Sequence, residues 1–393
     1  MKMDLIKYVF TFIILLILVP IIKLFQPFHI AFIFIPGIFL FYKPSRNIFF
    51  TIVAFLILFG ISIVFTFLFK NDYFSFGIIY QTLFFFFLLL FYDIGSKIEL
   101  DLRSFYKWIL AISLILAFLI LNQMIFHINL LTDFYLNQLS ENNIKVLNHY
   151  LLILYPFENS NSAAILFSFI ILVIEIISLN KRVILSQKEK LLTIFVVLIL
   201  LAGVILSYAR TTLAALVLSQ VFIFRKRILK LIPFILLFGL IILFIIKNDL
   251  DRNINYYSTI FNFTQDHSFT SRFIFWENIF NILKNNRLFV LTGVPFYKKE
   301  LAIIQTGEIA TVIDSNYLYI LIKTGILGFI FLLFSALRLF FKNLYLQSII
   351  FFIAIVSITL AFFDDYRFAI LISFFIGLIN NNLNTKELDS YEE

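Results

Sequence analysis

Residues 191–224 read LLTIFVVLILLAGVILSYARTTLAALVLSQVFIF and contain one charged side chain, Arg210. A membrane-spanning helix needs roughly 20 mostly apolar residues. The stretch holds 34 residues, or about 51 Å of helix, whereas two crossings of the hydrocarbon layer need about 60 Å. We therefore expect spans at 191–207 and 211–224, joined by a turn that is recessed below the outer surface and carries Arg210.

The composition of the whole chain supports the same interpretation. Of the 393 residues, 62% are hydrophobic and 14% are charged, against roughly 25% charged in an average soluble domain. A soluble fold would leave much of this apolar surface in water, whereas lipid removes the problem. Backbone groups in lipid must be satisfied within each segment, so the spans are expected to be helices. The predicted fold class is an all-α polytopic membrane protein with about 12 transmembrane helices and one large extracytoplasmic loop.

The apolar runs set the organisation of the chain. Spans are expected near 5–22, 28–42, 48–69, 74–92, 105–126, 160–179, 191–207, 211–224, 228–246, 316–341, 346–363 and 366–380. They divide the chain into N-terminal helices at 1–126, an outer loop at 127–159, helices that carry the Ser-Tyr-Ala-Arg motif at 160–246, a large extracytoplasmic loop at 247–315, C-terminal helices at 316–380 and a cytoplasmic tail at 381–393.

Charge and cysteine usage set the orientation and exclude several kinds of site. Lys and Arg concentrate in alternate loops, as in Arg225-Lys226-Arg227, and this bias predicts that both termini are cytoplasmic. The net charge of +8 is therefore assigned to basic inner loops, and no nucleic-acid partner is expected. The chain has no cysteine, which excludes disulfides, thiolate metal sites and cysteine nucleophiles. Its four scattered histidines show no metal-ligand spacing, so no metal and no cofactor are predicted.

Two arginines are the first candidates for chemistry. Arg210 is costly at membrane depth, and its guanidinium fork suits a phosphate or pyrophosphate; the alternative is an arginine that snorkels to the outer headgroups. Apolar residues at 273, 276, 279 and 280 predict an amphipathic helix on the outer membrane surface or on the bundle. Arg272 lies in its first turn, where the helix dipole disfavours a cation. Such a conflict suggests an external anion, and the alternative is an ordinary surface arginine.

The third candidate region is the re-entry of the chain into the membrane after the large loop. Asp314 precedes the expected span, either as a catalytic carboxylate or as its N-cap. Lys323 is expected about 10 Å deeper, either as a functional cation or as a snorkelling side chain. Gly325 and Gly328 allow close helix approach. Glu175, near the inner end of span 160–179, is expected to snorkel to the membrane surface.

These motifs, in this order, resemble the family of O-antigen polymerases and O-antigen ligases, which includes the Wzy-type oligosaccharide repeat-unit polymerases. The similar stretches are Ser207-Tyr208-Ala209-Arg210, Ser271-Arg272 with Trp276, Asp314-Ser315-Asn316-Tyr317, and Thr324-Gly325 with Gly328. The resemblance covers about 155–330. Ligases of the family carry a histidine before the asparagine, whereas this chain has Ser315, which favours a polymerase.

The resemblance implies a glycosyltransferase at the outer face of the bacterial cytoplasmic (inner) membrane. Its donor would be a glycan on undecaprenyl pyrophosphate, its acceptor another lipid-linked repeat unit, and its product a surface polysaccharide such as an O-antigen, capsule or exopolysaccharide. Membrane lipids, a chain-length regulator and a flippase are the expected partners. Arg210, Arg272 and Asp314 are the predicted catalytic residues. The predicted substrate-binding residues are Tyr208, Trp276, Asn316, Tyr317 and Lys323.

Other functions stay open at this stage. Within the family, the chain could act as a ligase that passes the glycan to another acceptor. A lipid-linked oligosaccharide flippase would also have about a dozen spans, but flippases usually show two similar halves, and no internal repeat is visible here. A non-catalytic membrane subunit is a third alternative, which no specific feature of the sequence supports.

Overall fold

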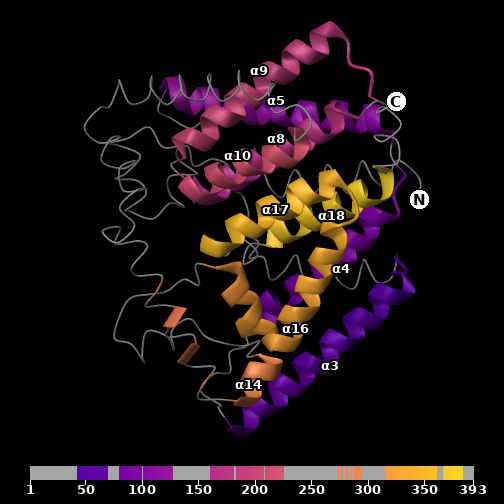
Figure 1. Cartoon of the computed structure of the whole chain (residues 1–393), viewed down its shortest axis with the longest axis vertical. Coiled ribbons are helices and arrows are strands. Elements are labelled where there is room, and N and C mark those ends of the chain that lie inside the picture. The colour runs from indigo at the N-terminus through magenta and orange to yellow at the C-terminus, as the bar shows by residue number, and fades with distance from the viewer. Residues whose placement is uncertain are drawn as a thin grey trace.

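The structure of the chain is a computed structural model. It describes residues 42–69, 79–99, 101–126, 160–180, 183–207, 209–224, 273, 276–277, 280–281, 284, 287–293, 315–360 and 366–383. Within these ranges the regular elements are helices (Figure 1). The ten helices with assigned bounds are α3 (Arg46–Phe69), α4 (Ile79–Ser96), α5 (Leu102–Phe126), α8 (Ser160–Ser178), α9 (Gln187–Leu206), α10 (Arg210–Phe224), α14 (Arg287–Thr292), α16 (Asn316–Phe340), α17 (Leu344–Thr359) and α18 (Tyr366–Asn382).

Length and apolar composition show which helices can cross a membrane. Among the residues that the structure describes, four segments are long and apolar enough to span: Leu102–Asn122, Asn161–Ser178, Gln187–Leu206 and Asn316–Phe340. Shorter apolar helices lie at Arg46–Ile61, Arg210–Phe224, Leu344–Thr359 and Ile370–Asn382. The helical bundle is therefore that of a membrane protein, as its composition indicates.

The predicted spans agree closely with the helices that the structure describes. Each predicted span between 48–69 and 366–380, except 228–246, coincides with one helix, and the ends differ by no more than about five residues. The spans predicted at 5–22, 28–42 and 228–246 lie outside the described residues, apart from Tyr42. The outer loop at 127–159 and most of the large loop also lie outside them. The all-helical fold class is confirmed, whereas the count of twelve and the segment boundaries stay predictions.

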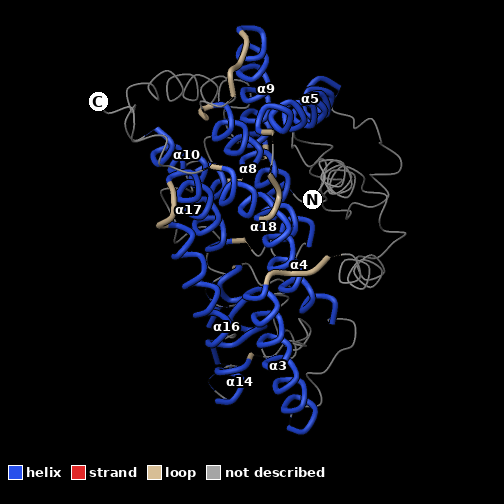
Figure 2. Tube along the Cα trace, turned by 90° about the vertical axis from the view of Figure 1, so that its right-hand side faces the viewer, coloured by secondary structure: helices blue, strands red, loops and turns tan. Residues whose placement is uncertain are grey.

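The helices lie side by side in an elongated bundle. Figures 1 and 2 both place α5 and α9 at one end of its longest axis, and α3 and α14 at the other. The most extensive contacts between helices join α4 with α18 and α10 with α17. α8 contacts α5, α9, α10 and α17, and α16 contacts α3, α14 and α17.

The core is centred on α8. Ala163, Phe167 and Phe169 each have 0% of their surface exposed, and the Phe169 ring meets the Phe375 ring of α18 edge-on at 5.5 Å between centroids. A helix that is apolar on all sides is expected where neighbours surround it completely. In contrast, Leu56 of α3 is 53% exposed and Phe334 of α16 is 67% exposed. Exposed apolar side chains such as these are suited to contact with lipid, in agreement with the apolar composition of the chain.

Hydrogen bonds tie several helix ends together on one side of the bundle. Asn382 of α18 donates to the Ile98 carbonyl after α4, at 2.8 Å, and Asn343 before α17 donates to the Leu383 carbonyl, at 3.2 Å. An ion pair between Arg103 and Glu189, at 3.8 Å, joins the first turns of α5 and α9. We call this side the basic end; its lysines and arginines are Lys43, Arg46, Lys97, Arg103, Lys107, Lys188, Lys190, Arg338 and Lys342.

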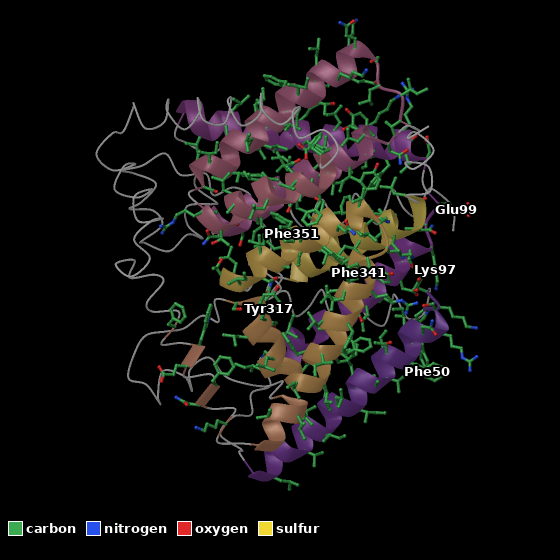
Figure 3. All side chains as sticks on the ribbon, in the orientation of Figure 1. Phe50, Lys97, Glu99, Tyr317, Phe341 and Phe351 are labelled. Atoms are coloured by element: carbon green, nitrogen blue, oxygen red, sulfur yellow. The ribbon has the colours of Figure 1, made fainter. Side chains whose placement is uncertain are left out.

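The basic end contains loops that the charge pattern predicts to face the cytoplasm. Figure 3 shows Lys97, Glu99 and Phe341 on this side, and Tyr317 toward the opposite side. Clustering of basic residues on one side agrees with the charge pattern of the loops. Which face of a membrane it occupies stays a prediction.

Candidate functional site

Arg210 is the first residue of α10 and is half-buried. The amide of Leu213 donates to the carbonyl of Ala209 at 3.0 Å, which makes Ala209 the N-cap of the helix. An alanine cap has no side-chain oxygen to accept a bond from the first-turn amides. Arg210 also places a cation at the positive end of the helix dipole, which is unfavourable unless an anion lies nearby. The start of α10 thus gathers hydrogen-bond donors and positive charge.

A hydrogen bond between α10 and α17 fixes the depth of Arg210. The Ser348 hydroxyl donates to the Ser219 carbonyl at 3.1 Å. α17 leaves the basic end after Asn343 and α10 runs toward that end, so the two helices are antiparallel. Residues 210 and 357 each lie nine positions away from this bond, or about 13 Å at 1.5 Å per residue. Arg210 and Ser357 therefore lie at the same depth, far from the basic end.

The start of α16 is fastened to this same end of α17. The Ser315 hydroxyl donates to the Ser357 carbonyl, and the Asn316 amide donates to the Ser357 hydroxyl, each at 3.1 Å. The hydroxyl of Tyr317 donates to the Ala354 carbonyl at 2.8 Å. We call this region, where α10 begins, α16 begins and α17 ends, the Arg210 end. Three segments that are far apart in sequence meet there.

The N-cap of α16 is not Asp314, which was one of the two roles predicted for that residue. Its N-cap position is Ser315, whose side chain makes no capping hydrogen bond and binds α17 instead. Ser315 is 3% exposed and Asn316 is 0% exposed. The Asn316 side chain thus joins α16 to α17, and its predicted role in substrate binding stays a prediction.

Buried hydroxyl groups without a hydrogen-bond partner occur near the Arg210 end. Thr212 Oγ1 and Thr359 Oγ1 have none, and Thr212 is 0% exposed. Elsewhere in the same helix the buried Ser219 hydroxyl donates to the Ala215 carbonyl at 2.6 Å, which is the usual arrangement in a helix. An unsatisfied buried hydroxyl costs about 1–3 kcal/mol. Thr212 and Thr359 each lie two residues from the level shared by Arg210 and Ser357.

A third unpartnered hydroxyl belongs to α8 at a similar depth. The Gln220 amide donates to the Glu175 carboxylate at 2.7 Å, which sets the register of the parallel helices α8 and α10. Seven residues before this pair, Ser168 lies level with residue 213, and its hydroxyl also lacks a partner. The same bond corrects the expectation for Glu175, because its carboxylate turns toward α10 rather than extending freely to the membrane surface.

The interior of α16 departs from the continuous helix predicted at 316–341. Gly325 has φ 65° and ψ −173°, so the helix is broken there. Lys323 precedes the break and is 1% exposed, with its Nζ 5.8 Å from the centroid of the Tyr319 ring. A cation in the last turn of the first helical part is favoured by the helix dipole. The snorkelling alternative for Lys323 is therefore wrong, since the side chain is buried.

Trp276 is the described site residue of the large loop. It is half-buried, and its ring lies 5.3 Å from that of Phe273, centroid to centroid. The indole Nε1 is buried without a partner, whereas Phe273 is 50% exposed and Phe280 is 53% exposed. The exposed phenylalanines fit the predicted amphipathic helix. Its contacts with membrane or bundle stay a prediction.

Three predicted site residues, Tyr208, Arg272 and Asp314, lie outside the described residues. The proximity of the two arginines is therefore untested. Among the described residues, no group of three or more His, Asp and Glu side chains gathers in the manner of a metal site. The structure adds Ser357, Thr212 and Thr359 to the region. No signal in the sequence distinguishes them from other hydroxyls in apolar helices.

Comparison with known proteins identifies a related family for part of this region. Residues 147–333 match the family model described as O-Antigen ligase. The match includes the starts of α10 and α16 and the break in α16, whereas Ser357 and Thr359 lie beyond it. No curated protein and no solved structure matches the chain.

Proposed function

Through residues 147–333, the chain belongs to the O-antigen ligase and polymerase family, and we propose that it is the polymerase type. Members of the family are glycosyl-transferring enzymes that act on lipid-linked glycans. The proposed reaction joins oligosaccharide repeat units carried on undecaprenyl pyrophosphate into a surface polysaccharide at the outer face of the cytoplasmic membrane. A chain-length regulator and a flippase would be its partners.

In the proposed reaction, a sugar hydroxyl of the acceptor attacks the anomeric carbon of the donor. A new glycosidic bond forms, the bond from the anomeric carbon to the pyrophosphate oxygen breaks, and undecaprenyl pyrophosphate leaves with the bonding electron pair. The hydroxyl proton passes to a base, for which Asp314 is the proposed residue. Negative charge grows on the pyrophosphate as the bond breaks. Arg210 and Arg272 would stabilise that charge.

The observation that carries this proposal is the surroundings of Arg210. A cation, a helix start with alanine at the N-cap and the unpartnered Thr212 hydroxyl occupy the first turn of α10. Each of these groups is stabilised by an anion. The buried Ser315 and Asn316, which start the segment that resembles the family's third motif, lie at the same depth through Ser357. A pyrophosphate near Arg210 would therefore lie near residues that adjoin the proposed base.

The choice of polymerase over ligase depends on Ser315. This residue stands where the ligases of the family carry a histidine, and its hydroxyl is already committed to the Ser357 carbonyl at 3.1 Å. An imidazole can accept a proton at physiological pH, whereas a serine hydroxyl does not, so Ser315 cannot replace a histidine base. Ligase activity is the second candidate, since the matching family model bears that description.

The experiment compares Arg210→Ala, Arg210→Lys and Arg272→Ala with Arg46→Ala, an exposed arginine at the basic end. In cells that make the polymer, Arg210→Ala and Arg272→Ala should each reduce polymerisation by about 100-fold or more. Single lipid-linked repeat units should accumulate on the outer face, and Arg46→Ala should give polymer of normal length. Arg210→Lys should recover little activity if the guanidinium fork matters.

Other outcomes separate the alternatives. Unchanged polymer length in both arginine variants would contradict the proposal. Accumulation of repeat units on the inner face would indicate a flippase. Normal polymer that is not transferred to a final acceptor would indicate a ligase.

A further inference from the structure

Thr212 lies in the same helical turn as Arg210 and has an unusual environment. Its residue surface is 0% exposed, and Oγ1 has no hydrogen-bond partner. A threonine hydroxyl inside a helix normally donates to the carbonyl four residues earlier. Ser113 of α5, which donates to the Ile109 carbonyl at 2.6 Å, shows this arrangement. Thr212 bears the desolvation cost of a buried hydroxyl without the bond that ordinarily offsets it.

Thr212 lies in the first turn of α10, where backbone amides also lack acceptors within the helix. With Ala209 as N-cap, Thr212 is the third residue of α10, and Cα–Cβ bonds in a helix tilt toward its N-terminus. The amides of the first three residues have no acceptor within the helix, and Ala209 supplies none from its side chain. The hydroxyl of Thr212 and these amides are therefore hydrogen-bond donors of the same first turn of α10.

Neighbouring helices carry further unpartnered hydroxyls at a similar depth. Thr359 at the end of α17 and Ser168 of α8 also carry buried hydroxyls without a partner. Both lie within about two residues of the depth of Arg210 to Thr212, by the registers that Ser219–Ser348 and Gln220–Glu175 set. Arg210 is the charged side chain of α10. An oxyanion can accept hydrogen bonds from hydroxyls and from the amides of a helix start, and it can lie beside a guanidinium.

We infer that the Thr212 hydroxyl is a positioning donor to a phosphate oxygen of the pyrophosphate that the start of α10 binds. The inference rests on the proposed function, and it deepens that function by naming a neutral donor beside Arg210. A fixed hydroxyl orients one phosphate group, whereas the guanidinium supplies charge. Contact between this donor and the ligand requires a small local shift, because Thr212 is fully enclosed.

The test uses Thr212→Val, which keeps the shape of the side chain and removes the hydroxyl, and Thr212→Ser, which keeps the hydroxyl. Ser113→Ala is the matched control, since it removes a buried hydroxyl that has a partner. The full-length protein in detergent is titrated with farnesyl pyrophosphate and with inorganic pyrophosphate, and thermal unfolding reports binding. Polymer length in cells is measured alongside.

Thr212→Val should lower the affinity for the ligand without lowering the unfolding temperature of the protein measured without ligand. Without ligand, its unfolding temperature should equal or exceed that of the wild type, because an unsatisfied hydroxyl is lost. Its affinity for farnesyl pyrophosphate should fall about tenfold or more, as for loss of a hydrogen bond to a charged group. Thr212→Ser should restore binding, and Ser113→Ala should bind normally. A tenfold loss for both ligands supports recognition of pyrophosphate itself, and a loss for farnesyl pyrophosphate alone supports a lipid-linked ligand.

The inference is overturned if Thr212→Val binds both ligands as the wild type does. It is also overturned if Thr212→Val is less stable than the wild type without ligand, because that result would show that buried water already satisfies the hydroxyl. Its failure is distinct from that of the proposed function. If Arg210→Ala loses binding and polymer while Thr212→Val keeps both, only the role of Thr212 is wrong. If Arg210→Ala keeps the polymer, the proposed function itself is wrong.

Discussion

Gly293 and Gly325 pack against each other backbone to backbone. Both have positive φ, 73° and 65°. A Cβ atom on Gly325 would lie 2.5 Å from the Gly293 nitrogen and 2.2 Å from the Leu291 carbonyl oxygen. A Cβ on Gly293 would in turn lie 2.5 Å from the Gly325 nitrogen. The end of α14, inside the segment predicted as the large loop, is therefore seated in the break of α16, two residues beyond the buried Lys323.

This contact predicts a large effect of one methyl group. Gly325→Ala should destabilise the protein by at least about 2 kcal/mol, because alanine is strained at positive φ and its Cβ meets backbone that cannot move freely. The control is Gly60→Ala in α3, where a Cβ meets nothing within 4 Å. Thermal unfolding in detergent measures both variants. Equal unfolding temperatures for the two would contradict the described contact.

The regular parts of the fold were predictable, whereas this break was not. Long apolar runs fix where helices such as α8 and α9 begin and end, because lipid leaves few alternatives for an apolar segment. The sequence Thr324-Gly325 suggested only close helix packing, since glycine is also common inside spanning helices. The helix breaks there because Gly293 occupies the space beside it, and such a contact between distant segments leaves no local pattern.

A second prediction concerns the attachment of α3 to α4 at the basic end. Asp93 accepts bonds from the Tyr42 hydroxyl at 2.8 Å, the Ser45 amide at 2.7 Å and the Lys97 ammonium at 3.0 Å. Asp93→Ala leaves three donors without this acceptor and should cost about 2–3 kcal/mol, since Lys97 is partly exposed and regains water. Asp101→Ala, at an exposed helix cap, should cost about 1 kcal/mol. Thermal unfolding that ranks Asp101→Ala as the more damaging change would refute this assignment.

The bond between Glu175 and Gln220 can be tested by a double-mutant cycle. Gln220→Leu removes the donor at 2.7 Å from the Glu175 carboxylate and should destabilise the protein by about 1–3 kcal/mol. Glu175→Leu should have a similar effect, because it leaves the Gln220 amide unpaired. The double variant should be closer to the wild type than the sum of the single variants, since no partner remains unsatisfied. Strict additivity in the unfolding free energies would show that the pair is not coupled.

The orientation of the bundle follows from a labelling experiment that the absence of cysteine makes simple. Phe273→Cys and Phe341→Cys place single thiols at side chains that are 50% and 75% exposed. The charge pattern predicts that a membrane-impermeant maleimide labels position 273 in cells with an accessible periplasmic or outer face, and labels position 341 only after lysis. The reverse pattern would invert the predicted topology and would place the Arg210 end in the cytoplasm.

The candidate site was predicted in part. Arg210 stood out because a lone arginine in a long apolar stretch is costly, and the motif around Asn316 marked the start of α16. Ser357 and Thr359 gave no signal, because serine and threonine are ordinary in apolar helices and satisfy themselves on the backbone. Their importance comes from packing, since Ser357 holds both Ser315 and Asn316.

In the proposed reaction, the start of α10 binds the pyrophosphate of the lipid-linked donor. An experimental structure of the full chain with a polyprenyl pyrophosphate bound tests it most directly. Phosphate oxygens are expected within about 3 Å of the Arg210 guanidinium and the Thr212 hydroxyl, at the depth of Ser357. A pyrophosphate held elsewhere, with Arg210 directed toward bulk lipid headgroups, would contradict it.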